Sequence, residues 1–303
     1  MSRPVDVLLE FLHAQQAQGM SHLHLDPDAR SGLRALSERL RAGRTAAAPA
    51  APPLASAPSR APARMGVLPL ADMPPVEPVP ARPGVPMPQL VIEGASRAEQ
   101  LAALRRQAAT WAPARALGTL REVMVFATGN PEARLMFIGE APGYEEEKKL
   151  EPFVGPAGQQ LDKILTAMGL ERGEVYISNV VKFRPATARQ STNNRPPVAE
   201  EIAACLPLLR AEINIIRPQC IIALGGCAAE GLLGVGGTVA SLRGSWHACE
   251  GIPLRVTYHP SYLLRTTHDT KPKRMVWEDM LAVMEKTGLP ISAKQRGFFL
   301  PKT

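Results

Sequence analysis

Short apolar runs alternate with longer amphipathic segments through the last two-thirds of the chain. Four runs rich in β-branched residues read "RLMFIG", "EVYISNVV", "QCIIALGG" and "PLRVTYHP". Around them, apolar residues recur at helical spacing at residues 97–110 and in "GPAGQQLDKILTAMGL", "PVAEEIAACLPLLRAEINII", "CAAEGLLG" and "KRMVWEDMLAVMEK". Strands that alternate with helices are typical of βαβ units. The pattern therefore predicts a three-layer α/β/α domain with a central, mostly parallel sheet.

A polar or glycine-rich sequence follows each predicted strand. "GEAPG" follows the first strand, Asn179 lies near the end of the second, "GG" follows the third and "HPS" follows the last. In open α/β sheets, ligands bind outside the carboxyl ends of the strands. Gly139, Gly143 and Gly155 also allow a close backbone approach. We therefore expect these elements to meet at one rim of the sheet and to hold a small ligand.

The first part of the chain lacks this alternation. Val5, Leu8, Leu9 and Leu12 form one short helical stripe. Between residues 46 and 88 lie 13 of the 30 prolines, mixed with alanine and valine, which is typical of a semi-extended linker. We expect four parts: a small N-terminal helical module at 1–45, a disordered Pro/Ala-rich linker at 46–95, the α/β domain at 96–290 and a basic C-terminal tail at 291–303.

Composition narrows the class of protein. The chain has 303 residues and is 45% hydrophobic, which is enough for a substantial core. Asp6 and Glu10 interrupt the apolar stretch near the N-terminus, so we expect neither a membrane span nor a signal peptide, and the prediction is a cytoplasmic protein. The four cysteines form no C-x-x-C pair, which argues against a disulfide framework or a zinc knuckle.

The net charge of +7 is uneven along the chain. Between residues 253 and 303 there are nine Lys and Arg residues against four Asp and Glu residues. Such a basic segment suits a polyanionic partner such as nucleic acid, because each phosphate contact releases counterions.

Several motifs in a fixed order resemble one known family. They are "GEAPGYEE", "PFVGPAGQQLDKIL", "VYISNVVK" and "TYHPSYLLR", followed by a "VWEDM" helix. Together they are similar to the family-4 uracil-DNA glycosylases over about residues 97–289. The resemblance implies a three-layer α/β fold, uracil in single- or double-stranded DNA as substrate, and hydrolysis of the N-glycosidic bond after the nucleotide is flipped out. We expect a monomer whose N-terminal module is a candidate for recruiting a repair or replication partner.

The resemblance also implies roles for pocket residues. Phe153 would stack on the flipped base, and the Asn179 amide would donate to uracil O4 and accept from N3–H. His259 would hydrogen-bond uracil O2 and stabilise negative charge on the departing base. Glu140 would position the attacking water, stabilise the oxocarbenium-like sugar, or both. Further base-binding positions are Ala141, Gly143 and Glu146.

The "HPSYLLR" segment and the residues after it are expected to contact DNA. Leu263 and Leu264, beside Arg265, would enter the gap left by the extruded base. Ser261 would contact a phosphate. The same is expected of the basic cluster formed by Lys271, Lys273 and Arg274.

Each role has a structural alternative. The two leucines could begin a packed helix, and Phe153 could be a core residue. Asn179 could be a turn residue, and Glu140 a cap. Glu146 could belong to a solvated acidic run with its two glutamate neighbours.

The sequence departs from the family at the iron–sulfur ligands. Family-4 enzymes hold a four-iron, four-sulfur cluster with four cysteines. Ala109, Ala112 and Phe183 stand at three of these positions, and only Cys205 matches. One thiolate cannot hold such a cluster. We therefore expect no cluster and no other cofactor, with Trp111 and Phe183 filling the space.

Three other functions compete with a glycosylase. The first is a catalytically inactive DNA-binding relative. The second is a nucleotide-cofactor enzyme built on "ALGGCAAEGLLGVGG", although this run lacks G-x-G-x-x-G at the strand-to-helix turn. The third is a metal hydrolase, for which ligand spacing is missing. Its candidate ligands would be His247, Cys249, His259 and His268.

Overall fold

The structure is a computed structural model that describes residues 87–266 and 269–299. All described residues belong to one compact unit, which lies within Ala71–Thr303. The predicted module at 1–45, the linker up to residue 86 and the last four residues of the predicted tail lie outside the described residues.

A six-stranded sheet forms the middle of the domain, in the order β2-β4-β3-β6-β8-β7. The four inner strands run parallel, and β2 and β7 pair antiparallel at the two edges. This confirms the mostly parallel sheet. The strands are β2 (Thr128–Gly129), β3 (Leu135–Gly139), β4 (Tyr176–Asn179), β6 (Cys220–Leu224), β7 (Trp246–Cys249) and β8 (Ile252–Thr257). A separate antiparallel pair joins β1 (Leu120–Met124) to β5 (Phe183–Pro185).

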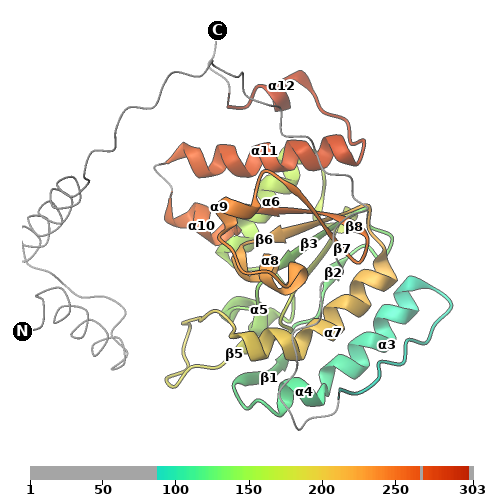
Figure 1. Ribbon diagram of the computed structural model, residues 1–303. Coiled ribbons are helices and arrows are strands. Elements are labelled where there is room, and N and C mark those ends of the chain that lie inside the picture. The colour runs from blue at the N-terminus through green and yellow to red at the C-terminus, as the bar shows by residue number, and fades with distance from the viewer. Residues whose placement is uncertain (1–86, 267–268, 300–303) are drawn as a thin grey trace, which may run out of the picture. The chain divides into compact units, whose positions relative to one another are not determined.

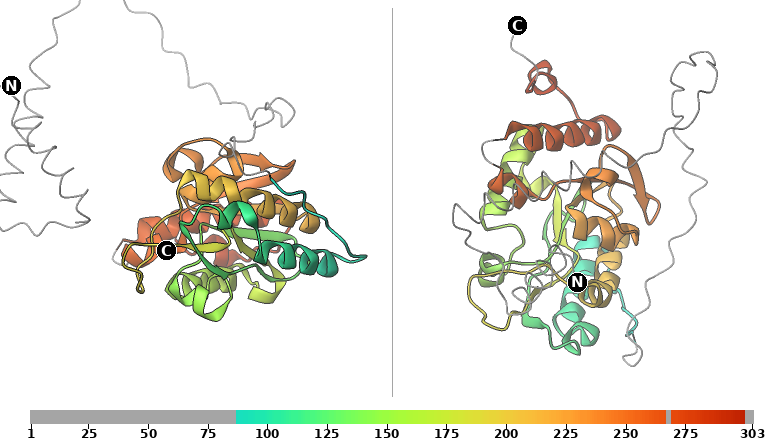
Figure 2. Two further views of the ribbon diagram at one scale, coloured as in Figure 1. Left: turned by 90° about the horizontal axis from the view of Figure 1, so that it is seen from below. Right: turned by 60° about the vertical axis from the view of Figure 1, so that its left-hand side comes forward.

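Helices cover both faces of the sheet, which confirms the predicted three layers. Figure 1 and Figure 2 show α6 and α11 on one face and α3 and α7 on the other. The helices are α3 (Arg97–Ala109), α4 (Ala112–Arg115), α5 (Tyr144–Lys149), α6 (Pro156–Met168), α7 (Ala199–Ile216), α8 (Gly226–Leu233), α9 (Val239–Leu242), α10 (Pro260–Arg265), α11 (Thr270–Lys286) and α12 (Ala293–Arg296), with a 3₁₀ turn at Arg172–Glu174.

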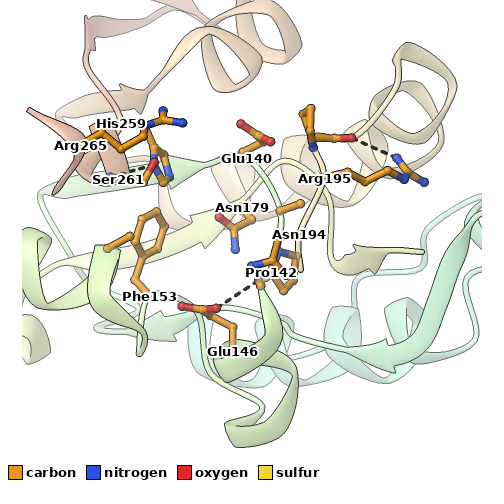
Figure 3. Close-up of a pocket in the computed structure, with 14 residues that line it drawn as sticks. Glu140, Pro142, Glu146, Phe153, Asn179, Asn194, Arg195, His259, Ser261 and Arg265 are labelled. Carbon is orange, nitrogen blue, oxygen red and sulfur yellow. Dashed lines mark hydrogen bonds between the residues drawn. The ribbon is translucent and has the colours of Figure 1, made fainter. Parts of the chain in front are cut away.

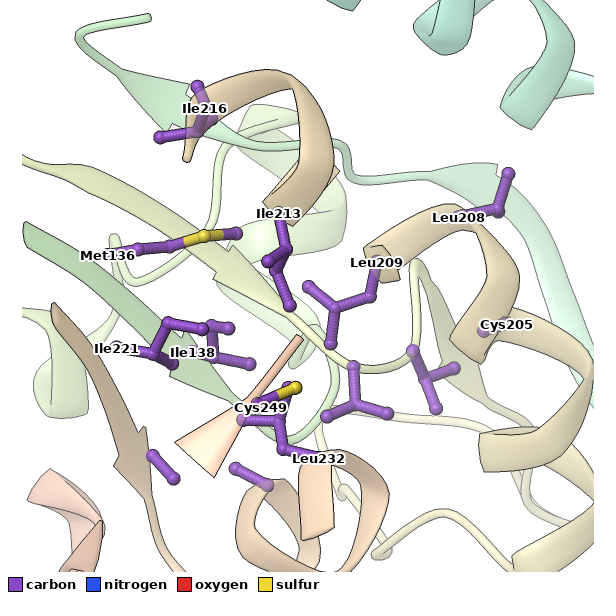
Figure 4. Close-up of a cluster of buried hydrophobic side chains, with 14 of the residues drawn as sticks. Met136, Ile138, Cys205, Leu208, Leu209, Ile213, Ile216, Ile221, Leu232 and Cys249 are labelled. Atoms are coloured by element: carbon purple, nitrogen blue, oxygen red, sulfur yellow. The ribbon is translucent and has the colours of Figure 1, made fainter. Parts of the chain in front are cut away.

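Side-chain alternation along β3 explains why both faces are covered. Met136 and Ile138 belong to the core on the α7 side, whereas Leu135 and Phe137 belong to the core on the α6 and α11 side. Figure 4 shows the first of these cores, where Leu209 of α7 packs above the strands. A strand buried on both faces reads as a continuous apolar run, as this one does.

Local signals fix the ends of the helices that frame the rim. The α6 helix begins after Gly155 with Pro156 in its first turn, where a missing N–H costs nothing. It ends at Gly169, whose φ of 80° suits glycine.

None of the helices within the described residues is long and apolar enough to cross a membrane.

Candidate active site

A cavity of about 460 Å³ opens at the carboxyl ends of the parallel strands. It is lined by the loop after β3, the end of β4, the loop before α7 and the β8–α10 junction (Figure 3). The lining residues are Glu140, Ala141, Pro142, Gly143, Glu146, Phe153, Ala157, Asn179, Asn194, Arg195, Pro196, His259, Ser261 and Arg265. Every residue expected to act on the base lies in this one cavity.

Phe153 forms one wall of the cavity. Its ring is buried and its centroid lies 5.6 Å from that of His259. Its φ of 56° is unusual for a residue with a side chain and stores backbone strain. Two glycines make room for this conformation: a Cβ on Gly158 would lie 1.7 Å from the Phe153 carbonyl oxygen, and one on Gly139 would lie 2.4 Å from its ring. The ring is therefore held in place by its surroundings.

Asn179 forms the floor of the cavity. It ends β4 beside Gly139 of β3 and is 2% exposed. Within the described part of the chain, its side-chain Nδ2 has no hydrogen-bond partner. A buried donor without a partner costs free energy, so native proteins rarely leave one unused. The amide is thus available to a ligand that offers an acceptor.

A buried ion pair lies behind Asn179. Lys182 Nζ is 2.7 Å from Glu212 Oε1, and both side chains are fully buried. Ser178 Oγ donates to Glu212 Oε2 at 2.6 Å, and Lys182 Nζ also donates to the Asn179 carbonyl oxygen at 2.8 Å. Burial raises the pKa of the Glu212 carboxyl, while the Lys182 charge acts in the opposite direction. The pair fixes the backbone of Asn179 against α7.

His259 stands at the start of α10 as a neutral hydrogen-bond donor. The Ser261 backbone N–H donates to His259 Nδ1 at 3.2 Å, and Ser261 Oγ lies 2.8 Å from the same nitrogen. Since a backbone N–H can only donate, Nδ1 carries no proton and the proton of the neutral ring is on Nε2. Burial, assisted by the nearby Arg265 charge, lowers the pKa of His259 to about 4.

Glu140 supplies the carboxylate of the site. It directly follows β3, and its carbonyl oxygen accepts from the Val181 N–H at 3.0 Å, which ties the loop to the end of β4. Burial raises the pKa of the Glu140 carboxyl, and the Arg265 charge partly offsets this effect. The same arginine therefore acts on both Glu140 and His259.

Glu146 braces two loops against each other. Its Oε2 accepts from the Gly143 N–H at 3.1 Å and its Oε1 accepts from the Gly155 N–H at 3.0 Å. The Gly143 amide is therefore engaged within the protein. The neighbouring Glu147 is 9% exposed and pairs with Arg184 at 3.0 Å, so this stretch is not a solvated acidic run.

Sequence reasoning missed the side of the cavity formed by the loop before α7. Asn194 Oδ1 accepts from Arg184 Nε at 2.9 Å. Its Nδ2 consequently faces the other way and would lie 2.9 Å from a Cβ on Gly143. Arg184, which is 1% exposed, also donates to the Ser191 and Asn193 carbonyl oxygens. The available signal was the position of this polar loop, which follows β5 near the end of β4.

The residues expected to contact DNA fall into three groups. Ser261 and Arg265 line the cavity. Leu264 is half-buried, but Leu263 is 5% exposed and packs in the core, so the predicted apolar wedge is reduced to Leu264. The basic cluster lies on the first turns of α11, outside the cavity lining, and consists of Lys271, Lys273 and Arg274.

The candidate metal ligands do not converge. His247 Nε2 is 2.8 Å from the Leu242 carbonyl oxygen, Cys249 is buried at the end of β7, and His268 lies outside the described residues. Throughout residues 87–266 and 269–299, no three His, Cys, Asp or Glu side chains are placed to hold a metal ion.

The place of the family's cluster ligands is filled by packed side chains. Trp111 is 3% exposed and donates from Nε1 to the Ala204 carbonyl oxygen at 2.7 Å. The Arg115 guanidinium lies 5.0 Å from the Phe183 ring centroid and donates to the Ala109 carbonyl oxygen at 2.9 Å. Burial raises the pKa of the one matching thiol, Cys205, to about 11, which favours the protonated thiol. These residues do not fit an iron–sulfur cluster.

Comparisons with known proteins agree with this geometry. The family model described as "Uracil DNA glycosylase superfamily" matches residues 126–281, which include the whole cavity lining. A type-4 uracil-DNA glycosylase of Thermotoga maritima is 42% identical over 164 residues, which are 53% of this chain and 81% of the relative. Those of Pyrobaculum aerophilum and Archaeoglobus fulgidus are 40% and 39% identical, over 48% and 45% of this chain and 75% and 69% of the relatives. The chain therefore belongs to the uracil DNA glycosylase superfamily, on its type-4 branch.

Proposed function

We propose that the protein is a uracil-DNA glycosylase, which flips uracil out of DNA and hydrolyses its N-glycosidic bond to leave an abasic site. One observation carries this proposal: an aromatic ring, an amide whose Nδ2 has no partner among the described residues, a neutral imidazole and a carboxylate line a single cavity of about 460 Å³. A cavity of this size is adequate for one flipped base and its sugar.

The base would be held between the ring of Phe153 and the amide of Asn179. The free Nδ2 of Asn179 donates to uracil O4, while its Oδ1 accepts from uracil N3–H. Cytosine offers the opposite pattern at these two positions, so an amide in this orientation selects uracil. The ion pair of Lys182 and Glu212 supports the position of Asn179 in the cavity, because Lys182 donates to the Asn179 backbone carbonyl oxygen.

His259 would stabilise the departing base. As the bond between the sugar C1′ and uracil N1 breaks, its electron pair leaves with uracil and negative charge develops on O2. The Nε2–H of His259 points its positive end at this charge, in the manner of an oxyanion hole. A neutral ring with a pKa of about 4 is suited to donating a hydrogen bond without an added charge.

Glu140 would serve the sugar and the attacking water. Its carboxylate stabilises the oxocarbenium-like sugar and orients the water whose oxygen bonds to C1′. The water loses a proton, and the uracil anion takes one up from solvent. The Nδ2 of Asn194, which lies beside Gly143, adds a further donor to the cavity lining.

The DNA strand would cross the mouth of the cavity. Arg265 and Ser261 contact the phosphates nearest the flipped nucleotide, and Leu264 enters the gap it leaves. The basic cluster on α11 would contact phosphates further along the strand, and its members are Lys271, Lys273 and Arg274.

We also propose that residues 96–290 form the catalytic domain, since the family match and the whole cavity lie within them. In this arrangement residues 1–45 remain a separate module that recruits a repair or replication partner.

The same proposal includes the absence of an iron–sulfur cluster. We expect protein purified without oxygen to contain no stoichiometric iron and to lack the visible absorbance of such clusters. The support is that alanines and Phe183 replace three ligands and that Trp111 and Arg115 pack in their place. Iron analysis checks this, with Cys205→Ala as the matched variant. One cluster's worth of iron that is lost in Cys205→Ala would refute it.

The pH dependence should report on Glu140. Because burial raises the pKa of this carboxyl above its ordinary 4.5, we expect uracil release to slow as the pH falls, starting above pH 4.5. His259 stays neutral down to about pH 4, so it does not contribute to this loss. Single-turnover rates across pH measure the effect. Glu140→Gln should be slow and lack this acid limb, and an unchanged limb in the variant would assign it to another group.

A direct assay tests the proposed function. Single- and double-stranded oligonucleotides that contain one uracil are incubated with the full-length protein, and free uracil is measured. Release of uracil with cleavable abasic sites is the expected result. Binding of the same oligonucleotides without release would instead favour the inactive DNA-binding relative.

A further inference from the structure

Two tyrosines form a stacked pair beside the cavity. The rings of Tyr258, directly after β8, and Tyr262, on α10, have centroids 5.0 Å apart and an interplanar angle of 21°. Tyr262 is 36% exposed, which is high for a large aromatic side chain. None of the roles derived above uses either ring.

The pair is anchored to the core from behind. The Arg243 guanidinium lies 5.9 Å from the Tyr258 ring centroid, which extends the stack inward. Arg243 is itself fixed, because it donates to the Met275 carbonyl oxygen at 2.6 Å and pairs with Asp279 at 3.1 Å. Asp279 is fully buried. The outer ring is therefore preorganised, so a partner that stacks on it need not order the side chain first.

Helix geometry places Tyr262 at the edge of the cavity mouth. Ser261 and Arg265, one turn apart on α10, line the cavity, and Leu263 is buried on the opposite side of the helix. With 3.6 residues per turn, Tyr262 and Leu264 lie on the two flanks between these sides. A DNA strand that places one nucleotide in the cavity therefore passes Tyr262 on one side of the flipped nucleotide and Leu264 on the other side.

We propose that Tyr262 is a stacking platform for the nucleobase next to the extruded uracil, and that it acts chiefly on single-stranded DNA. The inference rests on the proposed function. Every base has a π-face, so stacking on a tyrosine tolerates any neighbouring sequence. In a duplex the neighbouring base remains stacked and paired within the helix. In single-stranded DNA the neighbouring base has no pairing partner, and it can stack on the ring of Tyr262 instead.

Binding to a fluorescent oligonucleotide tests the platform. The probe is single-stranded DNA with 2-aminopurine on one side of a slowly hydrolysed 2′-fluorinated deoxyuridine, and its fluorescence falls when the purine stacks. We expect full-length protein to quench the probe on one side of the uracil. Tyr262→Phe should keep the quenching, whereas Tyr262→Leu should lose it and bind the single strand about 5-fold or more weakly.

Controls separate this role from folding and from the proposed function. Phe298→Leu changes another exposed aromatic, which does not line the cavity, and should leave quenching and affinity unchanged. Thermal unfolding shows whether Tyr262→Leu is folded. Quenching that persists in Tyr262→Leu, or an equal loss of affinity for duplex and single strand, would overturn the inference. If uracil is released but no variant changes the probe, only this inference fails. If the probe responds but no uracil is released, only the proposed function fails.

Discussion

His259→Ala is expected to slow uracil release by roughly 100- to 1000-fold, the usual effect of removing one donor that acts on transition-state charge. The Ser261 N–H fixes the proton of the neutral ring on Nε2, so the ring delivers a donor in one defined orientation. Alanine leaves the charge that develops on uracil O2 without this donor. Substrate binding should change less, because the charge appears only as the bond breaks.

Single-turnover rates at saturating protein measure the loss without interference from product release. His247→Ala is the matched control: its imidazole is also half-buried, but it bonds to the Leu242 carbonyl oxygen away from the cavity. This variant should release uracil at the wild-type rate. A loss of less than about 10-fold in His259→Ala would show that another group stabilises the leaving base.

Lys182→Met is expected to lower the free energy of unfolding by about 3–5 kcal/mol, the usual cost of leaving one partner of a buried ion pair alone. Glu212 is fully buried, and without Lys182 its charge would keep only the hydrogen bond from Ser178. For a domain of this size the loss corresponds to a fall in the unfolding temperature of roughly 6–20 °C. Thermal and urea unfolding of the full chain measure it.

The double variant Lys182→Met with Glu212→Leu provides the control. It removes both charges and keeps most of the volume, so it should recover most of the lost stability. If Lys182→Met alone unfolds within about 1 kcal/mol of the wild type, the pair does not carry the buried charge assigned to it. Activity of the folded double variant then shows how far the pair positions Asn179.

The sheet and its main helices could be predicted because their residues repeat with a clear period. β3 and β6 are continuous apolar runs, and α7 presents an apolar stripe over five turns. The edge strands lack such a signal: β2 has two residues and β7 mixes polar with apolar side chains. The α5 helix was missed for the same reason, since "YEEEKK" has no apolar stripe.

The position of a residue in the cavity could be predicted where a polar side chain follows or ends a strand, as for Asn179 and His259. It was not predictable where tertiary contacts decide the outcome. Leu263 and Leu264 are adjacent and alike, yet the side of α10 on which each falls buries one and leaves the other half-exposed. Asn194 lies in a polar loop whose course depends on the buried Arg184, and sequence pattern carries no signal for that contact.

The contact of Trp111 with α7 and the packing of Arg115 on Phe183 affect the conditions under which such an enzyme can work. Oxidants dismantle protein-bound iron–sulfur centres, and the same conditions damage DNA. If the cluster is absent, as proposed, the α3–α4 corner is joined to α7 by side chains alone and needs no assembly machinery after synthesis. We then expect the protein to remain folded during iron starvation and oxidative stress, when demand for repair is high.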